Sequence, residues 1–186
     1  MAHSDREVAD VIQEVLLDEQ AIAARVAELA ERITADYAEI DDLVLVGVLK
    51  GAFIFMADLT RRFKVAHHVD FIALSSYNSG TESTGAVRLI MDTRTSVTGR
   101  NVLIVEDILD TGHTLDYLLR TFSARQPRSL RTCVLLSKPA RLQVKVPVDY
   151  LGFEIPDKWV VGYGLDFADK YRTLPFIGAL KPEVYQ

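Results

Sequence analysis

The chain has 186 residues, of which 49% are hydrophobic and 25% charged, and its formal net charge is −5. These values are typical of one soluble globular domain with its own core, and the acidic balance argues against general nucleic-acid binding, although a local basic patch stays open. The single cysteine, Cys133, excludes an internal disulfide framework and a cysteine-rich metal site.

The amino terminus shows no secretory signal, because residues 1–10 are polar and acidic rather than basic and then apolar. No apolar run approaches the length that is needed to cross a membrane. We therefore expect a cytoplasmic protein without a membrane partner.

The first third of the chain predicts alternating strands and helices. Residues 15–17 predict a short strand. From Asp18, a residue type that caps helices, apolar positions recur every three or four residues, which predicts an amphipathic helix over residues 18–37. The apolar run 43–49 predicts a strand that is buried on both faces, and residues 52–63 predict a mostly buried helix.

Lys50 and Gly51 follow the predicted strand 43–49 directly. In a parallel sheet ligands bind beyond the carboxyl ends of the strands, and a glycine lets the backbone approach a ligand closely. The position favours a ligand contact, whereas by spacing alone a solvated lysine at a turn is the commoner case.

A long polar segment, residues 75–86, separates two predicted strands at 69–74 and 87–91. It has almost no apolar residue to anchor it, so we expect a mobile loop between the two arms of a hairpin. Long loops inside compact domains are often lids over a ligand site. Ordinary surface disorder is the competing interpretation.

The most informative stretch begins at the apolar run 102–105, which predicts a buried parallel strand. Glu106 and Asp107 end this run at the edge of the sheet where ligands bind. Asp110 and residues 111–114 then lead into a helix. They offer two hydroxyls, a glycine backbone and unpaired N–H groups, which together suit a phosphate.

Three carboxylates beside a phosphate would repel it unless Mg²⁺, sugar hydroxyls or protonation intervenes. Adjacent side chains of a strand point to opposite faces, so Glu106 and Asp107 would face one ion together only if the strand has already ended. The simpler alternative is that Asp107 and Asp110 only cap the next helix.

Residues 115–122 keep helical spacing, and residues 130–136 predict another buried strand. Cys133 lies in that strand among apolar neighbours, which favours a small core side chain over a nucleophile. Lys138 follows the strand, where spacing alone leaves it a solvated strand end.

Residues 148–166 predict two short strands. Trp159, the only tryptophan, lies between them and by pattern alone is a core residue. Asp166 and Arg172 by themselves predict no more than a surface ion pair.

Residues 105–115, Val-Glu-Asp-Ile-Leu-Asp-Thr-Gly-His-Thr-Leu, resemble the signature of type I phosphoribosyltransferases, which bind 5-phosphoribosyl-1-pyrophosphate (PRPP). Residues 47–51, 75–77 and 153–166 resemble the hypoxanthine-guanine members of that family, and the match covers nearly the whole chain. The resemblance implies an α/β fold with a twisted, mainly parallel sheet flanked by helices. It implies one domain over residues 1–186, with a small hood from the N-terminal and C-terminal segments and a mobile lid loop at about 75–86.

The resemblance also implies a reaction, the transfer of 5-phosphoribosyl from PRPP to N9 of hypoxanthine or guanine in purine salvage, with IMP or GMP and pyrophosphate as products and Mg²⁺ as cofactor. Asp110 would be the catalytic base. The ribose and 5′-phosphate would lie against Glu106, Asp107, Asp110, Thr111, Gly112, His113 and Thr114. The pyrophosphate would contact Lys50, Gly51 and Arg172, the purine would contact Lys138, Trp159, Val160 and Asp166, and the metal would contact Glu106, Asp107 and Asp166. The lid would contribute Ser76 and Tyr77.

Two residues bear on which base is accepted. The ammonium group of Lys138 only donates hydrogen bonds, so it would favour the carbonyl of a 6-oxopurine over the amino group of adenine. Many relatives carry phenylalanine where Trp159 stands, which leaves the fine base preference open.

The family is usually dimeric or tetrameric, so a homodimer or homotetramer without a nucleic-acid partner is expected. Two alternatives stay open: a regulator of the same fold that senses nucleotides and binds RNA on a basic face, and an enzyme that uses xanthine or a pyrimidine. The acidic net charge argues weakly against the regulator. The joint presence of Lys138, Trp159 and Asp166 argues against it more strongly.

Overall fold

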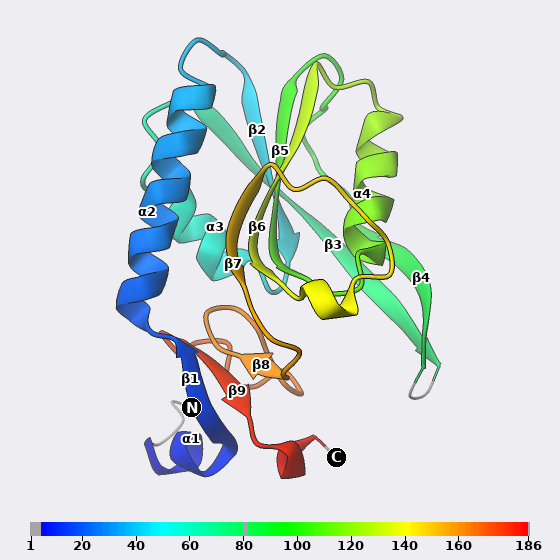
Figure 1. The fold of residues 1–186 in the computed structure, drawn as a ribbon. Coiled ribbons are helices and arrows are strands. Elements are labelled where there is room, and N and C mark those ends of the chain that lie inside the picture. The colour runs from blue at the N-terminus through cyan, green and yellow to red at the C-terminus, as the bar shows by residue number, and fades with distance from the viewer. Residues whose placement is uncertain (1–4, 80–81, 186) are drawn as a thin grey trace.

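The computed structural model of the chain describes residues 5–79 and 82–185 (Figure 1). Within these residues six strands form a large sheet and three form a small one. In chain order the elements are α1 Asp5–Val11, β1 Ile12–Leu17, α2 Glu19–Asp36, β2 Leu43–Leu49, α3 Phe53–Thr60, β3 His67–Ser79, β4 Glu82–Met91, β5 Asn101–Leu109, α4 His113–Ser123, β6 Ser129–Ser137, β7 Tyr150–Glu154, β8 Val160–Val161 and β9 Ile177–Leu180, with the 3-10 turns η1 Pro139–Arg141 and η2 Pro182–Val184.

The large sheet has the strand order β4-β3-β2-β5-β6-β7. Strands β3, β2, β5, β6 and β7 run parallel, and β4 pairs antiparallel with β3. Helices α2 and α3 pack on one face of this sheet and α4 on the other (Figure 1). The predicted α/β architecture is therefore confirmed. It brings the carboxyl ends of β2, β5 and β6 to one edge of the sheet, where ligands bind in such folds.

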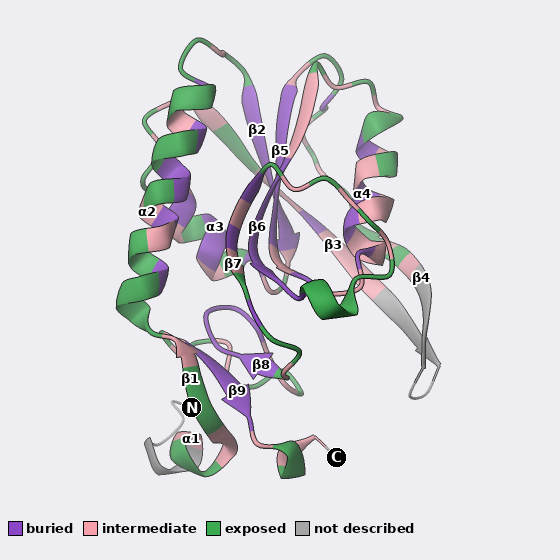
Figure 2. Cartoon of the chain, viewed as in Figure 1, coloured by how far each residue is buried: buried purple, intermediate pink, exposed green. Residues whose placement is uncertain are grey.

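Neighbouring residues of β2 belong to two different cores. Leu43 and Leu45 pack under α2 and α3, whereas Val44 and Val46 pack under α4. A strand covered on both faces needs an apolar side chain at every position, which explains the continuous run in the sequence. Figure 2 shows these strands buried and the outer faces of the helices exposed. Cys133 on β6 is fully buried and burial raises the pKa of its thiol, so it is a core side chain.

The small sheet has the order β1-β9-β8, with antiparallel pairs, and lies beyond the carboxyl ends of the large sheet (Figure 1). We use the name hood for this sheet together with residues 155–176. Strand β9, which was not predicted, is only four residues long but is buried along its whole length. It joins the two ends of the chain, because β1 and β9 lie next to each other.

Most predicted elements are observed. Asp18 caps α2 by accepting a hydrogen bond from the Ala21 N–H at 2.7 Å. The predicted strand at 15–17 is longer and begins at Ile12, after a helix that was not predicted. The two strands predicted within residues 148–166 are β7 and β8, which belong to different sheets. Among the described residues no helix is both long and apolar enough to cross a membrane.

Two expectations about the sheet were wrong. Strand β5 does not end before Glu106 but continues to Leu109, because its pairing with β6 persists to Ser137. The segment 75–86 is not an open loop, since β3 and β4 pair as far as Ser79 and Glu82. An antiparallel ribbon satisfies its backbone hydrogen bonds without apolar side chains, so a polar sequence can still form it.

The predicted lid therefore lies on a β-ribbon at the edge of the sheet. Residues 80–81 and the side chains of Ser76 and Tyr77 lie outside what the structure describes. The lid remains a prediction.

Candidate active site

A cleft of about 490 Å³ lies between the carboxyl ends of β5 and β6 and the hood. Five of the predicted site residues line it, although they are spread over more than fifty positions of the chain. They are Asp110, Lys138, Trp159, Val160 and Asp166, and they are joined by Ile108, Arg141, Asp157, Leu165 and Tyr185, which the sequence did not single out.

The loop 110–114 connects β5 to α4 at one end of this cleft. Gly112 has φ +92° and directly precedes α4, and a Cβ there would collide with the carbonyl oxygen of Val144. The Thr111 carbonyl accepts hydrogen bonds from the N–H groups of Gln143 at 3.0 Å and Val144 at 3.1 Å. The loop is thus held from behind, and the unpaired N–H groups of the first turn of α4 remain available for an anion.

His113 lies at the start of this helix. Its Nε2 is 3.0 Å from Oε1 of Gln143. This contact holds the imidazole against the supporting segment, which fits an exposed first-turn residue better than a direct phosphate ligand.

The Lys50–Gly51 loop follows β2, with the Gly51 backbone packed against Asp107 of the large sheet and Gly164 of the hood and the Lys50 side chain exposed. The peptide between Leu49 and Lys50 is cis. A Cβ on Gly51 would overlap the carboxyl group of Asp107, and a Cβ on Gly164 would overlap the carbonyl oxygen of Gly51. The Asp107 carboxyl group, the Gly51 backbone and the Gly164 backbone therefore lie so close together that only glycine fits at positions 51 and 164.

Two cations and two carboxylates connect this loop to the hood. Arg172 Nη2 lies 2.8 Å from Asp166 Oδ1 and 2.9 Å from Asp169 Oδ1. Lys50 Nζ lies 3.1 Å from Asp169 Oδ2. The hydrogen bond from Arg172, followed by that from Lys50, lowers the pKa of Asp169. Asp169 was not predicted as a site residue. Its pairing with Lys50, which is more than one hundred positions away in the sequence, follows only from the fold.

Glu106 and Asp107 form an acidic pair on β5. Glu106 is only 7% exposed, and its Oε2 has no hydrogen-bond partner. Burial, then the neighbouring charge of Asp107, raises the pKa of Glu106 far above its usual value, and burial raises the pKa of Asp107 as well. The strand continues past both residues, and each carboxyl group affects the pKa of the other.

This pair fits a divalent cation in donor type, because hard cations prefer carboxylate oxygens and one oxygen is buried without a partner. The third predicted ligand, Asp166, is instead paired with Arg172. Among the residues that the structure describes, no three acidic, histidine or cysteine side chains are grouped closely enough to hold a metal ion by themselves. A cation here would complete its coordination with oxygen atoms of a ligand or of water.

Lys138 and Asp110 lie on the same wall of the cleft. Lys138 is 8% exposed, and burial lowers the pKa of its ammonium group, against the opposing effect of Asp110 and Asp157. Arg141 Nε donates a hydrogen bond of 2.6 Å to Asp110 Oδ1. Lys138 is therefore no solvated strand end, and Asp110 does not cap α4 but pairs with an arginine that the sequence analysis missed.

Trp159 is not a core residue, since 49% of its surface is exposed. Its ring packs edge-on against Phe167 at 5.8 Å and stacks on Tyr185 at 5.4 Å between centroids. Val160, the next residue, is buried and pairs with Ala179 of β9. The tryptophan is thus an exposed aromatic surface held by the hood.

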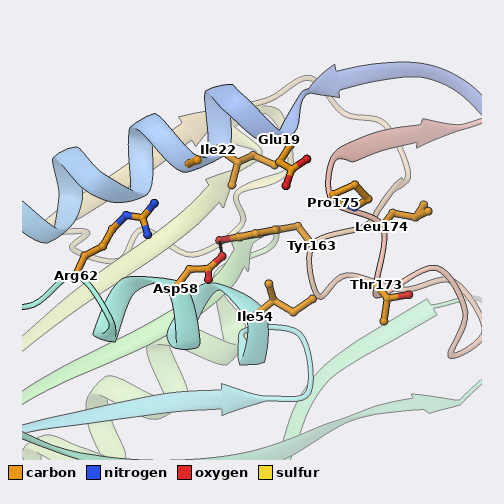
Figure 3. A pocket seen from close by; sticks show the side chains of 10 residues that line it. Glu19, Ile22, Ile54, Asp58, Arg62, Tyr163, Thr173, Leu174 and Pro175 are labelled. Carbon is orange, nitrogen blue, oxygen red and sulfur yellow. Dashed lines mark hydrogen bonds between the residues drawn. The ribbon is translucent and has the colours of Figure 1, made fainter.

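A second cavity, of about 340 Å³, lies outside this cleft between α2, α3 and residues 173–175 (Figure 3). The hydroxyl of Tyr163 points into it and donates a hydrogen bond of 2.7 Å to Asp58 of α3. Burial and this carboxylate raise the pKa of Tyr163. Because Tyr163 precedes Gly164, the bond ties the backbone beside Gly51 to α3.

Comparison with known proteins gives consistent matches. A family model described as "Phosphoribosyl transferase domain" matches residues 13–168. The chain is 49% identical to the hypoxanthine-guanine phosphoribosyltransferase of Dictyostelium discoideum over 94% of the chain and 98% of that protein. It is 51% identical to the hypoxanthine phosphoribosyltransferase of Escherichia coli K12 over 89% of the chain and 93% of that protein. The crystal structure of a hypoxanthine phosphoribosyltransferase from Staphylococcus aureus superposes with a TM-score of 0.92 at 44% identity, over 99% of this chain and 100% of that chain.

The acidic pair predicts a specific pH dependence of stability. Both raised pKa values mean that the folded chain holds protons which the unfolded chain releases near pH 4 to 5. The stability from this pair is complete below that range and is lost as the pH rises through the raised values. With chelator and without ligand, Glu106→Gln should therefore be more stable than the wild type at pH 8, by about 1 to 2 kcal/mol, and nearly equal at pH 4.

Denaturant unfolding at several pH values measures this difference. Glu154→Gln, at an exposed position on β7, controls for the loss of one carboxyl group. Parallel pH profiles for wild type and Glu106→Gln would contradict the prediction.

Proposed function

The chain belongs to the phosphoribosyltransferase family, and on this premise we propose what each residue of the cleft does. The protein is a purine salvage enzyme that transfers 5-phosphoribosyl from PRPP to N9 of hypoxanthine or guanine. The products are IMP or GMP and pyrophosphate. One observation supports the residue roles: Asp110, a buried ammonium group and an exposed aromatic ring line one cleft, and Asp110 directly precedes the loop that leads into the first turn of α4.

The 5′-phosphate of PRPP binds at residues 111–114, where the first turn of α4 presents its N–H groups. Glu106 and Asp107 accept hydrogen bonds from the ribose hydroxyls. Their raised pKa values support this role, because a carboxylate pair that is unfavourable without a ligand gains from hydroxyl donors or a cation. This arrangement separates the acids from the phosphate charge.

The pyrophosphate lies between Lys50, Gly51 and Arg172. In the free protein both cations are paired with Asp169, which holds them at this position. Guanidinium and ammonium groups stabilise the negative charge that gathers on the leaving pyrophosphate when its bond to the sugar breaks. The exchange of a carboxylate for a diphosphate keeps both cations compensated.

The cofactor is Mg²⁺, which Glu106 and Asp107 would hold together with oxygen atoms of the donor. When bound, it neutralises part of the diphosphate charge and so makes pyrophosphate a better leaving group. Asp166 contributes to a second cation only if Arg172 turns away from it, because the two are paired in the free protein.

The purine binds between Trp159 and Ile108, with its 6-oxo group toward Lys138 and its edge against the backbone of Val160. As N9 attacks the anomeric carbon, the bond from that carbon to pyrophosphate breaks and Asp110 accepts the proton from N7. In the free protein Arg141 Nε donates to Oδ1 of Asp110, which would make this carboxylate a weaker base as long as the bond is kept.

The lid and the assembly complete the proposal. The β3-β4 ribbon carries Ser76 and Tyr77 and covers the reacting atoms while they are sequestered from water. We also propose that the enzyme forms a homodimer or homotetramer.

Asp110→Asn should fold and bind nucleotide normally but lose turnover by about a hundredfold or more, because an amide accepts no proton at neutral pH. Pyrophosphate release with PRPP, Mg²⁺ and hypoxanthine measures kcat. Asp157→Asn, also in the cleft wall but not placed on the reacting atoms, is the matched control. Turnover of Asp110→Asn equal to that of the wild type would remove Asp110 from the mechanism.

Lys138→Gln should weaken the discrimination between hypoxanthine and adenine by about tenfold or more, because an amide can both donate and accept a hydrogen bond. The ratio of kcat/KM for the two bases measures this effect. The same assay with guanine, xanthine and a pyrimidine ranks the other acceptors. If the ratio stays unchanged, another group recognises position 6.

PRPP should raise the melting temperature of the protein only when Mg²⁺ is present. At a hundredfold excess over its dissociation constant a ligand stabilises by about 2.7 kcal/mol, which is readily measured. Asp107→Asn should lose most of the increment that depends on Mg²⁺, whereas Glu154→Gln should keep it. An equal increment with chelator would contradict the metal-assisted binding of the donor.

A further inference from the structure

The aromatic contact between Trp159 and Tyr185 is not explained by the reaction. The two rings are nearly parallel, at 26° with centroids 5.4 Å apart. Tyr185 is the last described residue, yet it lines the same cleft as Lys138 and Asp110. A half-exposed tryptophan that binds a substrate by stacking needs a defined ring orientation, and here a second aromatic ring packs on it.

Hydrogen bonds fix the C-terminal segment 181–185, here called the tail, which carries this tyrosine. Lys181 N–H donates to the Val11 carbonyl at 3.0 Å, and Lys181 Nζ donates to the Asp10 carbonyl at 2.8 Å. The Tyr185 N–H then donates to the Pro182 carbonyl at 3.2 Å in turn η2. These bonds connect the tail to the end of α1 and to its own turn, so the position of Tyr185 is set by packing against the N-terminal segment rather than by a free chain end.

The residue that precedes the tail holds the backbone of the tryptophan. Leu180 N–H donates to the Trp159 carbonyl at 2.8 Å, at the end of the β8-β9 pair. Lys158, the preceding residue, forms an ion pair with Glu14 of β1. The backbone of Trp159 is therefore fixed by the Leu180 N–H, and its indole ring is in contact with the rings of Phe167 and Tyr185.

The elements that line the cleft around Trp159 come from two parts of the fold. In Figure 1 the carboxyl terminus lies on the side of β8 that is away from the large sheet, whereas β5 and η1 lie on the opposite side. Ile108 and Lys138 enter the cleft from β5 and from the end of β6. Trp159 thus stands where residues of the large sheet and a tyrosine of the C-terminal segment line one cleft, and Tyr185 can cover only one of the two faces of its indole.

We infer that Tyr185 is a positioning residue for the base. It packs on one face of the Trp159 indole and holds this ring parallel to the purine, which stacks on the other face. The inference rests on the proposed function, because it assigns the purine to that face. The tail thereby contributes to affinity for the base and has no part in the binding of PRPP.

Tyr185→Ala should raise KM for hypoxanthine by about three- to tenfold, the range that corresponds to one aromatic pair. KM for PRPP and kcat should change less than twofold, since neither depends on the indole. Tyr185→Phe keeps the ring and should restore the wild-type KM. Glu183→Ala, an exposed position in the same turn, should behave like the wild type.

Fluorescence gives an independent readout, because Trp159 is the only tryptophan. In Tyr185→Ala its emission should shift to longer wavelength and its anisotropy should fall, with no change in Tyr185→Phe. In a Trp159→Ala background, Tyr185→Ala should have no further effect on KM for the base, since the effect passes through the indole.

The outcomes separate the inference from the function. A wild type that releases no pyrophosphate with any purine would overturn the proposed function itself. An active wild type with an unchanged base KM in Tyr185→Ala would overturn the positioning role alone. A lower base KM in Tyr185→Ala would also overturn it, because the tyrosine would then compete with the purine.

Discussion

The contact of Gly51 with Asp107 on one side and Gly164 on the other is the constraint on which the site depends. It joins the end of β2, the acidic pair of β5 and the hood at one point, with no room for a side chain. Because three separate segments meet there, the positions of Lys50 and Arg172 relative to the acids are set by backbone packing. The bond from Tyr163 to Asp58 ties the same backbone to α3 from the far side.

The charges of the cleft are compensated in the free protein. Lys50 and Arg172 share Asp169, Arg141 pairs with Asp110, and burial raises the pKa values of the acidic pair. For the buried Glu106 an isolated charge would be unfavourable, so it tends toward its neutral form, whereas the more exposed groups are paired. On the proposed residue roles, substrate binding would exchange partners rather than create new charges. An acidic protein can bind a highly charged anion in this way, because the local arrangement outweighs the net charge.

Local patterns were enough to predict most of the large sheet. The runs 43–49 and 102–105 are continuous because both faces are covered, and the capped helix that begins after Asp18 has the spacing of an amphipathic helix. The grouping of Asp110, Lys138 and Trp159 was predicted by family resemblance, since spacing alone gave each of them an ordinary structural role. Their common cleft is a consequence of parallel strand ends meeting a hood.

The features that sequence analysis missed depend on contacts between distant segments. Strand β9 is four residues long and gains its stability from β1, which is more than 150 positions away. Arg141 and Tyr185 reach the cleft only because η1 and the tail fold back onto it. The outer part of the β3-β4 ribbon, residues 75–86, was predicted as a loop because its polar sequence gives no sign of the backbone pairing. No local periodicity reports such pairings.

The burial of Cys133 has a practical consequence for spectroscopy. It is the only sulfhydryl of the chain, and inside β6 it is both inaccessible and disfavoured as a thiolate, which is the form that reacts with maleimides and iodoacetamides. The native folded protein should therefore not react with maleimide or iodoacetamide labels. Two cysteines engineered on the outer surface, one on the hood and one on a helix of the large sheet, can each carry a label, so the distance between hood and sheet becomes measurable without first removing a native residue.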